Sequence, residues 1–128
     1  MKKILAFLFC LNLVISCKKS NEGSSPIFGK WSFSPAIHDI YTNGSISSTS
    51  NQNYPASDYI EFKNNGQAEG NANGGIYTYT YTLENDNLIF DNIRKGKITQ
   101  LTASKLIYYF KDSINPTQYR VSTLSLFK

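Results

Sequence analysis

The feature that most constrains this chain is residues 76–83, where tyrosine and threonine alternate without interruption. Because successive side chains of a β-strand point to opposite faces, a period of two predicts a strand with one aromatic face and one hydroxyl-bearing face. The aromatic face carries Tyr77, Tyr79, Tyr81 and Leu83. Tyrosine and threonine both suit a pleated, half-buried surface. A single strand cannot bury its own face, so we expect further strands curled around these tyrosines.

The rest of the chain shows the same strand signals, and its 128 residues suffice for one domain. Short alternating runs are separated by Asn-Gly and other turn residues, which predicts about eight strands. We expect these strands near residues 27–34, 58–63, 67–71, 76–83, 88–91, 95–101, 105–111 and 118–127. Most connections are too short for parallel crossovers. The sequence therefore predicts an all-β fold, an antiparallel up-and-down barrel of about eight strands, with a two-sheet β-sandwich as the alternative.

One connection does not fit this regular pattern. Residues 35–57 are rich in serine, threonine and asparagine and show no apolar period. A segment of this length without a strand signal predicts a mobile loop or a lid. His38 and Asp39 lie at its start, and we expect both to be solvated loop residues, because a lone histidine has no catalytic partners in view.

The N-terminus carries an export signal. Lys2 and Lys3 precede an apolar run over residues 4–15 that is too short to span a bilayer and is typical of a secretory signal. The run ends in Val-Ile-Ser-Cys at residues 14–17, which resembles the lipobox of bacterial lipoproteins. That resemblance implies cleavage before Cys17, diacylglycerol on its sulfur and an acyl chain on its new amino group. The alternative is an ordinary cleaved signal followed by an incidental cysteine.

The use of cysteine agrees with lipidation. Cys10 leaves with the leader, so Cys17 is the single thiol of the exported chain and no internal disulfide can form. We expect a signal peptide at residues 1–16, a flexible tether at 17–26 and a folded domain at 27–128. Lys18 follows the cysteine, where an aspartate would resemble an inner-membrane retention signal. The expected location is therefore the cell envelope, anchored by lipid to the outer membrane and facing the periplasm.

The first expected strand carries Gly29-Lys30-Trp31, which resembles the Gly-x-Trp signature of lipocalins and lipocalin-like bacterial lipoproteins. Three later segments also resemble strands of those lipoproteins, at residues 58–66, 81–90 and 98–106. The resemblance implies a barrel that binds or carries a small apolar or amphipathic molecule. It also implies a structural signature of Gly29, Trp31 and Arg120, in which the arginine stacks on a buried Trp31 and closes one end.

An eight-stranded barrel has an interior that is either filled by side chains or able to hold one small ligand. If it is hollow, aromatic rings supply apolar walls and tyrosine hydroxyls orient the ligand. The candidate ligand-binding residues are Tyr77, Tyr79, Tyr81, Phe90 and Tyr108. If these rings fill the interior instead, the protein is a structural module whose apolar outer patch docks an envelope protein partner.

Several functions are disfavoured by composition. Removal of Lys2 and Lys3 with the leader lowers the net charge from +4 to +2, and the remaining basic residues are scattered, so no nucleic acid partner is expected. One histidine and one lipidated cysteine are too few for a metal site. The chain lacks the motifs of a nucleophile elbow or a phosphate loop. We therefore expect a protein that is not an enzyme and needs no cofactor.

Lipidation is directly testable by metabolic labelling. Cells supplied with labelled palmitate should label the wild-type protein, and Cys17→Ser should abolish the label, because the thioether bond requires sulfur. The variant should also leave the membrane fraction. Label that persists on the Cys17→Ser protein would show that the lipobox interpretation is wrong.

Overall fold

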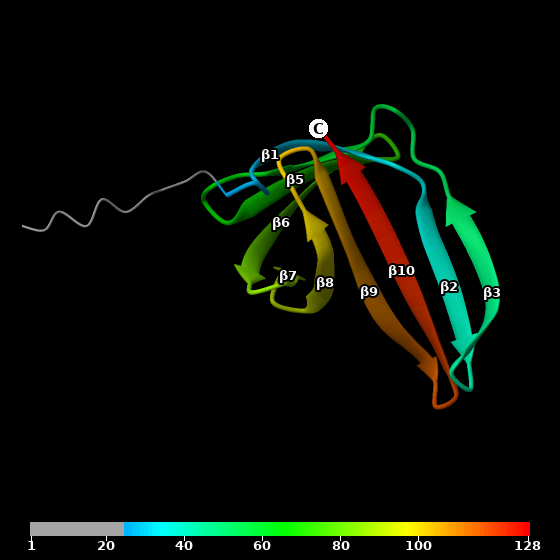
Figure 1. Ribbon diagram of the computed structural model, residues 1–128. Coiled ribbons are helices and arrows are strands. Elements are labelled where there is room, and N and C mark those ends of the chain that lie inside the picture. Colours follow the sequence, from blue (N-terminus) through cyan, green and yellow to red (C-terminus); the bar gives the residue numbers. More distant parts are fainter. Residues whose placement is uncertain (1–24) are drawn as a thin grey trace, which may run out of the picture.

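The computed structural model describes residues 25–128, which form ten β-strands and, within that range, no helix (Figure 1). The strands are β1 (Gly29–Phe33), β2 (Ala36–Thr42), β3 (Ser45–Gln52), β4 (Tyr59–Phe62), β5 (Gln67–Ala72), β6 (Gly75–Glu84), β7 (Asn87–Phe90), β8 (Arg94–Leu101), β9 (Lys105–Asn115) and β10 (Gln118–Phe127). The predicted signal peptide, Cys17 and most of the predicted tether lie outside the described residues. Between residues 25 and 128 we find no helix long and apolar enough to cross a membrane.

Eight of the strands close into a barrel. Their order around the ring is β1-β4-β5-β6-β7-β8-β9-β10, and β10 returns to pair with β1. All neighbours are antiparallel, and from β4 to β10 each strand pairs with the next one in the chain. This arrangement confirms the predicted up-and-down barrel rather than a β-sandwich.

Two-residue Asn-Gly turns set the register of two hairpins. Asn73 and Gly74 join β5 to β6 with φ angles of 52° and 78°, and Asn43 and Gly44 join β2 to β3 with 51° and 82°. Positive φ at both central residues is the mark of a type I′ turn, whose twist matches that of the flanking strands. Asparagine and glycine adopt this conformation at little cost. The turn at Asn73-Gly74 agrees with the sequence prediction, whereas the turn at Asn43-Gly44 lies in a segment that was predicted to be a loop.

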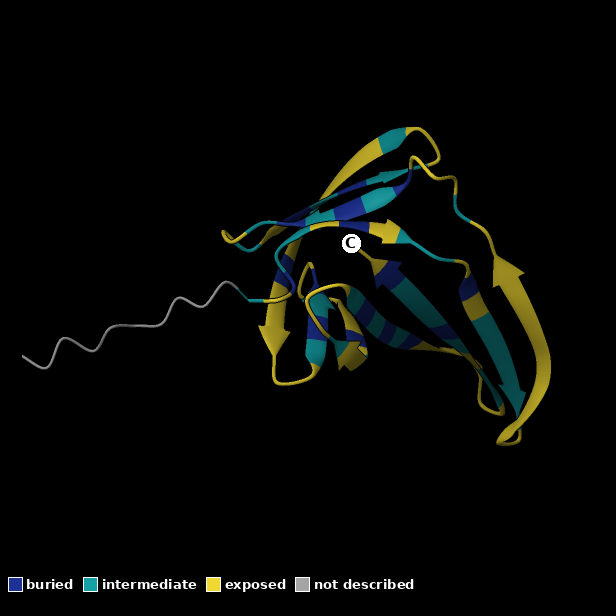
Figure 2. Cartoon of the chain, turned by 45° about the horizontal axis from the view of Figure 1, so that its top comes forward, coloured by how far each residue is buried: buried dark blue, intermediate teal, exposed yellow. Residues whose placement is uncertain are grey.

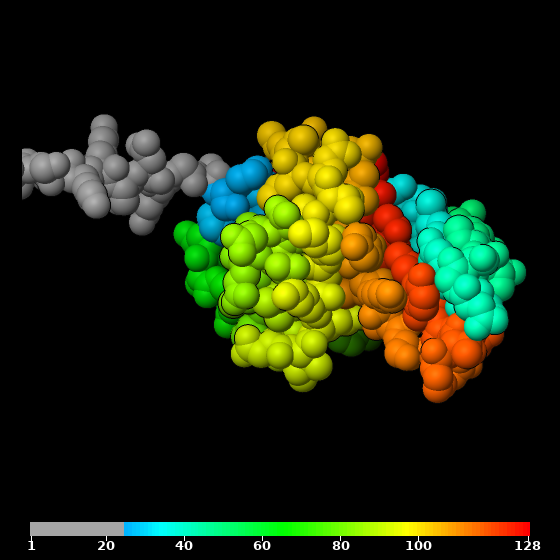
Figure 3. Space-filling model, turned by 60° about the horizontal axis from the view of Figure 1, so that its bottom comes forward, coloured from blue at the N-terminus to red at the C-terminus, as the bar shows by residue number. Residues whose placement is uncertain are grey.

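The predicted loop at residues 35–57 is largely wrong, because β2 and β3 form a hairpin within it. We call Ala36–Gln52 the β2–β3 extension. It lies beside the first half of β10, at one side of the barrel, as the ribbon and space-filling views show (Figures 1 and 3). β3 pairs only with β2 and is exposed along its whole length (Figure 2). A strand that buries neither face needs no apolar alternation, which is why the sequence pattern missed it.

His38 is part of this hairpin rather than a solvated loop residue. Its Nε2 lies 3.1 Å from Oε1 of Gln52, and its Nδ1 lies 2.9 Å from the hydroxyl of the buried Ser122. Since the Gln52 oxygen accepts, Nε2 carries the hydrogen and Nδ1 accepts from Ser122. The imidazole thereby links β2 to both β3 and β10, and we assign it a structural role.

One end of the barrel is filled by side chains. The indole of Trp31 is fully buried there, and its Nε1 donates to the carbonyl of Ile27 at 2.7 Å. Buried around it are Ile27, Phe62, Ala68, Leu88, Leu106 and Leu126. The burial of Trp31 agrees with the face it shares with Ile27 and Phe33. We call this the closed end.

The cation over the indole is Lys128, not the predicted Arg120. The Lys128 Nζ lies 4.3 Å from the centre of the Trp31 ring and donates to the carbonyls of Pro26 and Phe28 at 2.9 and 2.6 Å. The reason is register: β10 pairs with β1 only through Leu126 and Phe127, so Lys128 is level with the indole. Arg120 lies roughly 26 Å earlier along the strand and is exposed.

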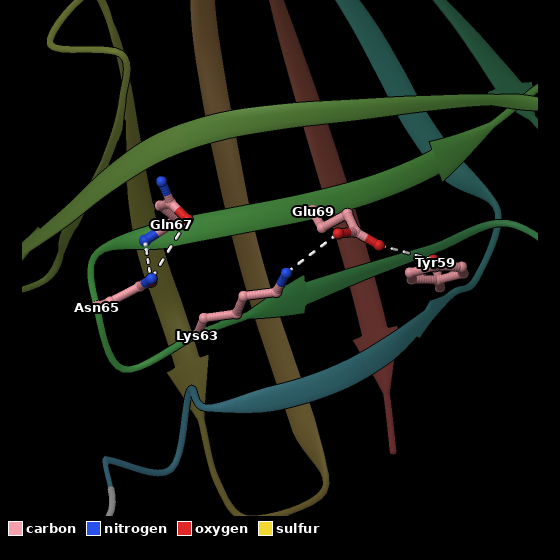
Figure 4. A network of polar contacts seen from close by, with 5 residues as sticks. All are labelled: Tyr59, Lys63, Asn65, Gln67 and Glu69. Atoms are coloured by element: carbon pink, nitrogen blue, oxygen red, sulfur yellow. Dashed lines mark hydrogen bonds and ion pairs between the residues drawn. The ribbon is translucent and has the colours of Figure 1, made fainter.

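The outer face of the β4–β5 hairpin carries a polar network (Figure 4). Lys63 Nζ lies 3.1 Å from Oε2 of Glu69, whose other oxygen accepts from the Tyr59 hydroxyl at 3.3 Å. The hydrogen bond and charge of Lys63 lower the pKa of the Glu69 carboxyl. These groups are exposed, so the network supports the hairpin register more than it contributes to overall stability.

Urea denaturation tests the closed end. Trp31→Ala removes a large core side chain and leaves a cavity, so we expect a loss of about 3–5 kcal/mol in the free energy of unfolding. Lys128→Ala should cost about 0.5–1 kcal/mol, as for an exposed cation over an aromatic ring. Arg120 contacts neither Trp31 nor Lys128, so the free energy of unfolding of Arg120→Ala should stay within about 0.5 kcal/mol of wild type. A greater loss for Arg120→Ala than for Lys128→Ala would contradict this assignment.

Candidate ligand-binding site

The opposite end of the barrel is an open cup with a volume of about 250 Å³. We call this the aromatic cup. Its lining comes from the ends of strands around the whole ring and from one residue of the β3–β4 connection. The lining residues are Phe33, Tyr54, Tyr59, Ile60, Gly70, Ala72, Tyr77, Tyr79, Phe90, Arg94, Tyr108, Phe110 and Leu124. The barrel is therefore partly filled and partly hollow.

Aromatic contacts build the wall of the cup. The Phe90 ring is central, with centroid distances of 5.9 Å to Tyr79, 6.4 Å to Tyr108 and 6.3 Å to Phe110. Gly96 on β8 makes room for this cluster, because a Cβ there would lie 3.0 Å from the ring of Phe110. Edge-to-face and tilted rings at these distances attract one another, so the wall is a preformed surface.

Position along β6 decides how deep each predicted tyrosine lies. Tyr77 is at the mouth and 49% exposed, Tyr79 is half-buried, and Tyr81 is only 7% exposed. The Tyr81 hydroxyl donates to the carbonyl of Lys63 at 2.7 Å, and its ring packs edge-on against Phe62 in the closed end. Tyr81 therefore lies below the cup, while the other four candidates, Tyr77, Tyr79, Phe90 and Tyr108, line it.

Phenol hydroxyls turn towards the cup without partners of their own. Among residues 25–128, the hydroxyls of Tyr54, Tyr79 and Tyr108 make no hydrogen bond with another residue. Burial raises the pKa of all three phenols, most strongly that of Tyr108, whereas the charge of Arg94 acts in the opposite direction. The hydroxyls thus stay protonated at neutral pH and are available as donors or acceptors.

Arg94 is the one charged residue in the lining. Its register partner is Phe90, so its side chain leaves the inner face of β8. The guanidinium carbon lies 4.1 Å from the ring centre of Phe110, and one terminal nitrogen lies 3.5 Å from Oδ2 of Asp112. Arg94 and Asp112 are each about half exposed, which places this charge at the mouth of the cup.

Sequence reasoning missed several of the lining residues, among them Phe110, Arg94 and Tyr54. Phe110 follows Tyr108 by two positions, so the same alternation could have indicated it. Arg94 reaches the mouth only through the β7–β8 register, which no local pattern reveals. Tyr54 lies in an irregular segment and is placed by stacking on Phe33, with centroids 4.7 Å apart.

In the part of the chain that the structure describes, no three metal-ligating side chains come together. Comparison with protein-family models found no matching family, and neither the curated proteins nor the solved structures gave a match. The likeness to lipocalin-like lipoproteins accordingly remains a resemblance, supported at the level of an eight-stranded antiparallel barrel.

Alkaline titration tests the burial of Tyr108. Burial raises the pKa of the Tyr108 phenol above its unfolded value near 10. The neutral phenol therefore contributes its full stability below about pH 10, and this contribution is lost as the pH rises further. Wild type should therefore lose about 1 kcal/mol of stability per pH unit above about pH 10 through this group, and Tyr108→Phe should lose less. Urea midpoints at neutral and alkaline pH measure the difference. Tyr109→Phe, on the outer face of the same strand, is the matched control. Equal alkaline losses in wild type and Tyr108→Phe would contradict the assignment.

Proposed function

We propose that this protein binds a small apolar or amphipathic molecule in the aromatic cup. The observation that carries the proposal is that the barrel is filled at the closed end and open at the other, with aromatic walls and unpaired hydroxyls. Apolar walls with a few convergent polar groups are typical of ligand sites. A volume of about 250 Å³ is just below the about 300–1,000 Å³ of drug-sized pockets, so it suits a small molecule or one end of a longer one.

The proposed setting is the cell envelope, with the domain tethered through a lipidated Cys17 to the outer membrane on its periplasmic side. The support is the lipobox and the leader that precedes it. The described chain enters the barrel at the closed end, where Lys128 binds the carbonyl of Pro26. The mouth of the cup therefore lies at the end remote from the tether, where a ligand can enter from the periplasm.

A second candidate function is docking of an envelope protein along β3. This strand has one unpaired edge and no charged residue, and its Ile46 is exposed, as is Ile37 on the neighbouring β2. Natural sheets usually protect such edges with charges, proline or bulges. A partner strand that pairs with β3 would satisfy its free backbone groups.

Cavity filling tests the first function. A Cβ on Gly70 would lie 3.6 Å from the Tyr79 ring, an ordinary contact, so Gly70→Leu should fold and project its side chain into the cup. We expect wild type to bind the neutral fluorescent probe N-phenyl-naphthylamine, and Gly70→Leu to lose this binding. Thr78→Leu adds a leucine on the outer face of β6 and should bind as wild type does.

Native mass spectrometry of protein purified from its own membranes should then reveal a co-purifying small molecule. Equal probe binding by wild type and Gly70→Leu would show that the probe binds elsewhere. A wild-type protein that binds no probe and carries no ligand, but captures an envelope protein through β3, would favour the second function.

A further inference from the structure

We infer that the ligand is an anionic amphiphile, whose carboxylate or phosphate head is bound by Arg94 at the mouth while its apolar part fills the aromatic cup. This inference rests on the proposed function and names the chemical class of the ligand. It is carried by the position of Arg94, by the weakness of its internal ion pair and by the phenols that surround it.

Stacking holds the guanidinium of Arg94 in place. Its central carbon is 4.1 Å from the ring centre of Phe110, so the guanidinium lies over the aromatic wall. A guanidinium presents five N–H donors in a planar fork that matches the oxygens of a carboxylate or phosphate. An anion at the mouth of the cup therefore meets a guanidinium that is held against the wall.

The ion pair with Asp112 leaves most of the N–H donors of Arg94 without a partner. The contact with Asp112 is long, at 3.5 Å, and involves one terminal nitrogen, and the two side chains are 56% and 50% exposed. Exposed ion pairs of this kind contribute little and exchange readily. Asp112 also lies opposite Arg120 on β10, so two arginines share the neighbourhood of one carboxylate. The charge of Asp112 is therefore shared between two guanidinium groups.

The phenols complete the site. Tyr54, Tyr79 and Tyr108 line the same cup as Arg94. Burial raises the pKa of all three phenols, so they stay protonated at neutral pH. Protonated phenols donate hydrogen bonds to an anion. One cation and several neutral donors therefore converge on one end of an apolar cup.

Two other carboxylates lie near the mouth and decide where the head group sits. Asp91 accepts from the backbone nitrogen and the hydroxyl of Thr80, at 2.7 and 3.1 Å, and its charge helps to raise the pKa of Tyr79. Asp58 is buried beside Tyr54, and its charge helps to raise the pKa of that phenol. Its field repels an anion from the β4 side. The head group is therefore expected on the β8–β9 side, at Arg94.

A matched series of ten-carbon amphiphiles tests the inference on the full chain. Decanoate, decyl phosphate, decanol and decylamine share one tail and differ in head-group charge, and each is measured by displacement of N-phenyl-naphthylamine. Wild type should bind decanoate and decyl phosphate about tenfold more tightly than decanol, and decylamine most weakly. Inorganic phosphate alone should not displace the probe, because the apolar part contributes much of the affinity.

Variants separate the head-group contact from the cup. Arg94→Gln should remove the preference for decanoate while its affinity for decanol stays unchanged, which also shows that the cup is intact. Lys95→Gln removes the same charge from the next residue, whose side chain leaves the outer face, and should behave as wild type. Asp112→Asn should strengthen decanoate binding, because it frees Arg94.

The outcomes distinguish failure of the anionic head-group inference from failure of the proposed ligand-binding function. If wild type binds decanol as tightly as decanoate, or if Arg94→Gln keeps the anionic preference, the head-group inference is overturned while the cup remains a binding site. If inorganic phosphate alone displaces the probe, the anion site is independent of the apolar tail and the inference also fails. If no member of the series binds wild type, the proposed function itself fails.

Discussion

The short pairing between β1 and β10 is the contact on which the rest of the structure depends. Only two residue pairs close the ring, Ser32 with Phe127 and Phe33 with Leu126. Two pairs provide little hydrogen bonding, so the closure is held mainly by burial of Trp31 and Leu126 beneath it and by Lys128 across the end. Without this seam the sheet would have two free edges, and neither the closed end nor the cup would exist.

The seam is short because β10 serves two partners. Its last two residues, Leu126 and Phe127, pair with β1, and residues 118–123 pair with β2, which begins after Ser34-Pro35. Proline has no backbone N–H and so cannot continue the ladder, which suits the point where the chain leaves the barrel wall. The same break allows β9 and β10 to extend past the mouth. The extension and the open cup are therefore two results of one interruption.

The sequence predicted the barrel because its strands bury one face each. Alternation marked the inward residues of β6, and the Asn-Gly pairs at residues 65–66 and 73–74 marked the turns on either side of β5. The sequence analysis did not predict β3, because this strand buries neither face. Its stability comes from backbone pairing, which does not require an alternating side-chain pattern. The mistake over Arg120 has a different origin. Which residue of β10 lies level with Trp31 depends on long-range register, and a local pattern gives the face of a side chain but not its height in the barrel.

Small residues on β5 leave space for the open cup. Gly70 and Ala72 on β5 line the cup, whereas Ala68 on the same face is buried in the filled end. Gly70 does not have a positive φ, and a Cβ there would make only ordinary contacts at 3.6 Å. Neither backbone strain nor crowding therefore requires glycine, which costs stability in a strand. Small barrels are filled when large and small residues alternate to match the taper. Here Gly70 lies between Ile60 and Tyr77 in the sheet, and the space that it leaves belongs to the cup. The stability lost at Gly70 is understandable if that space is used by a ligand.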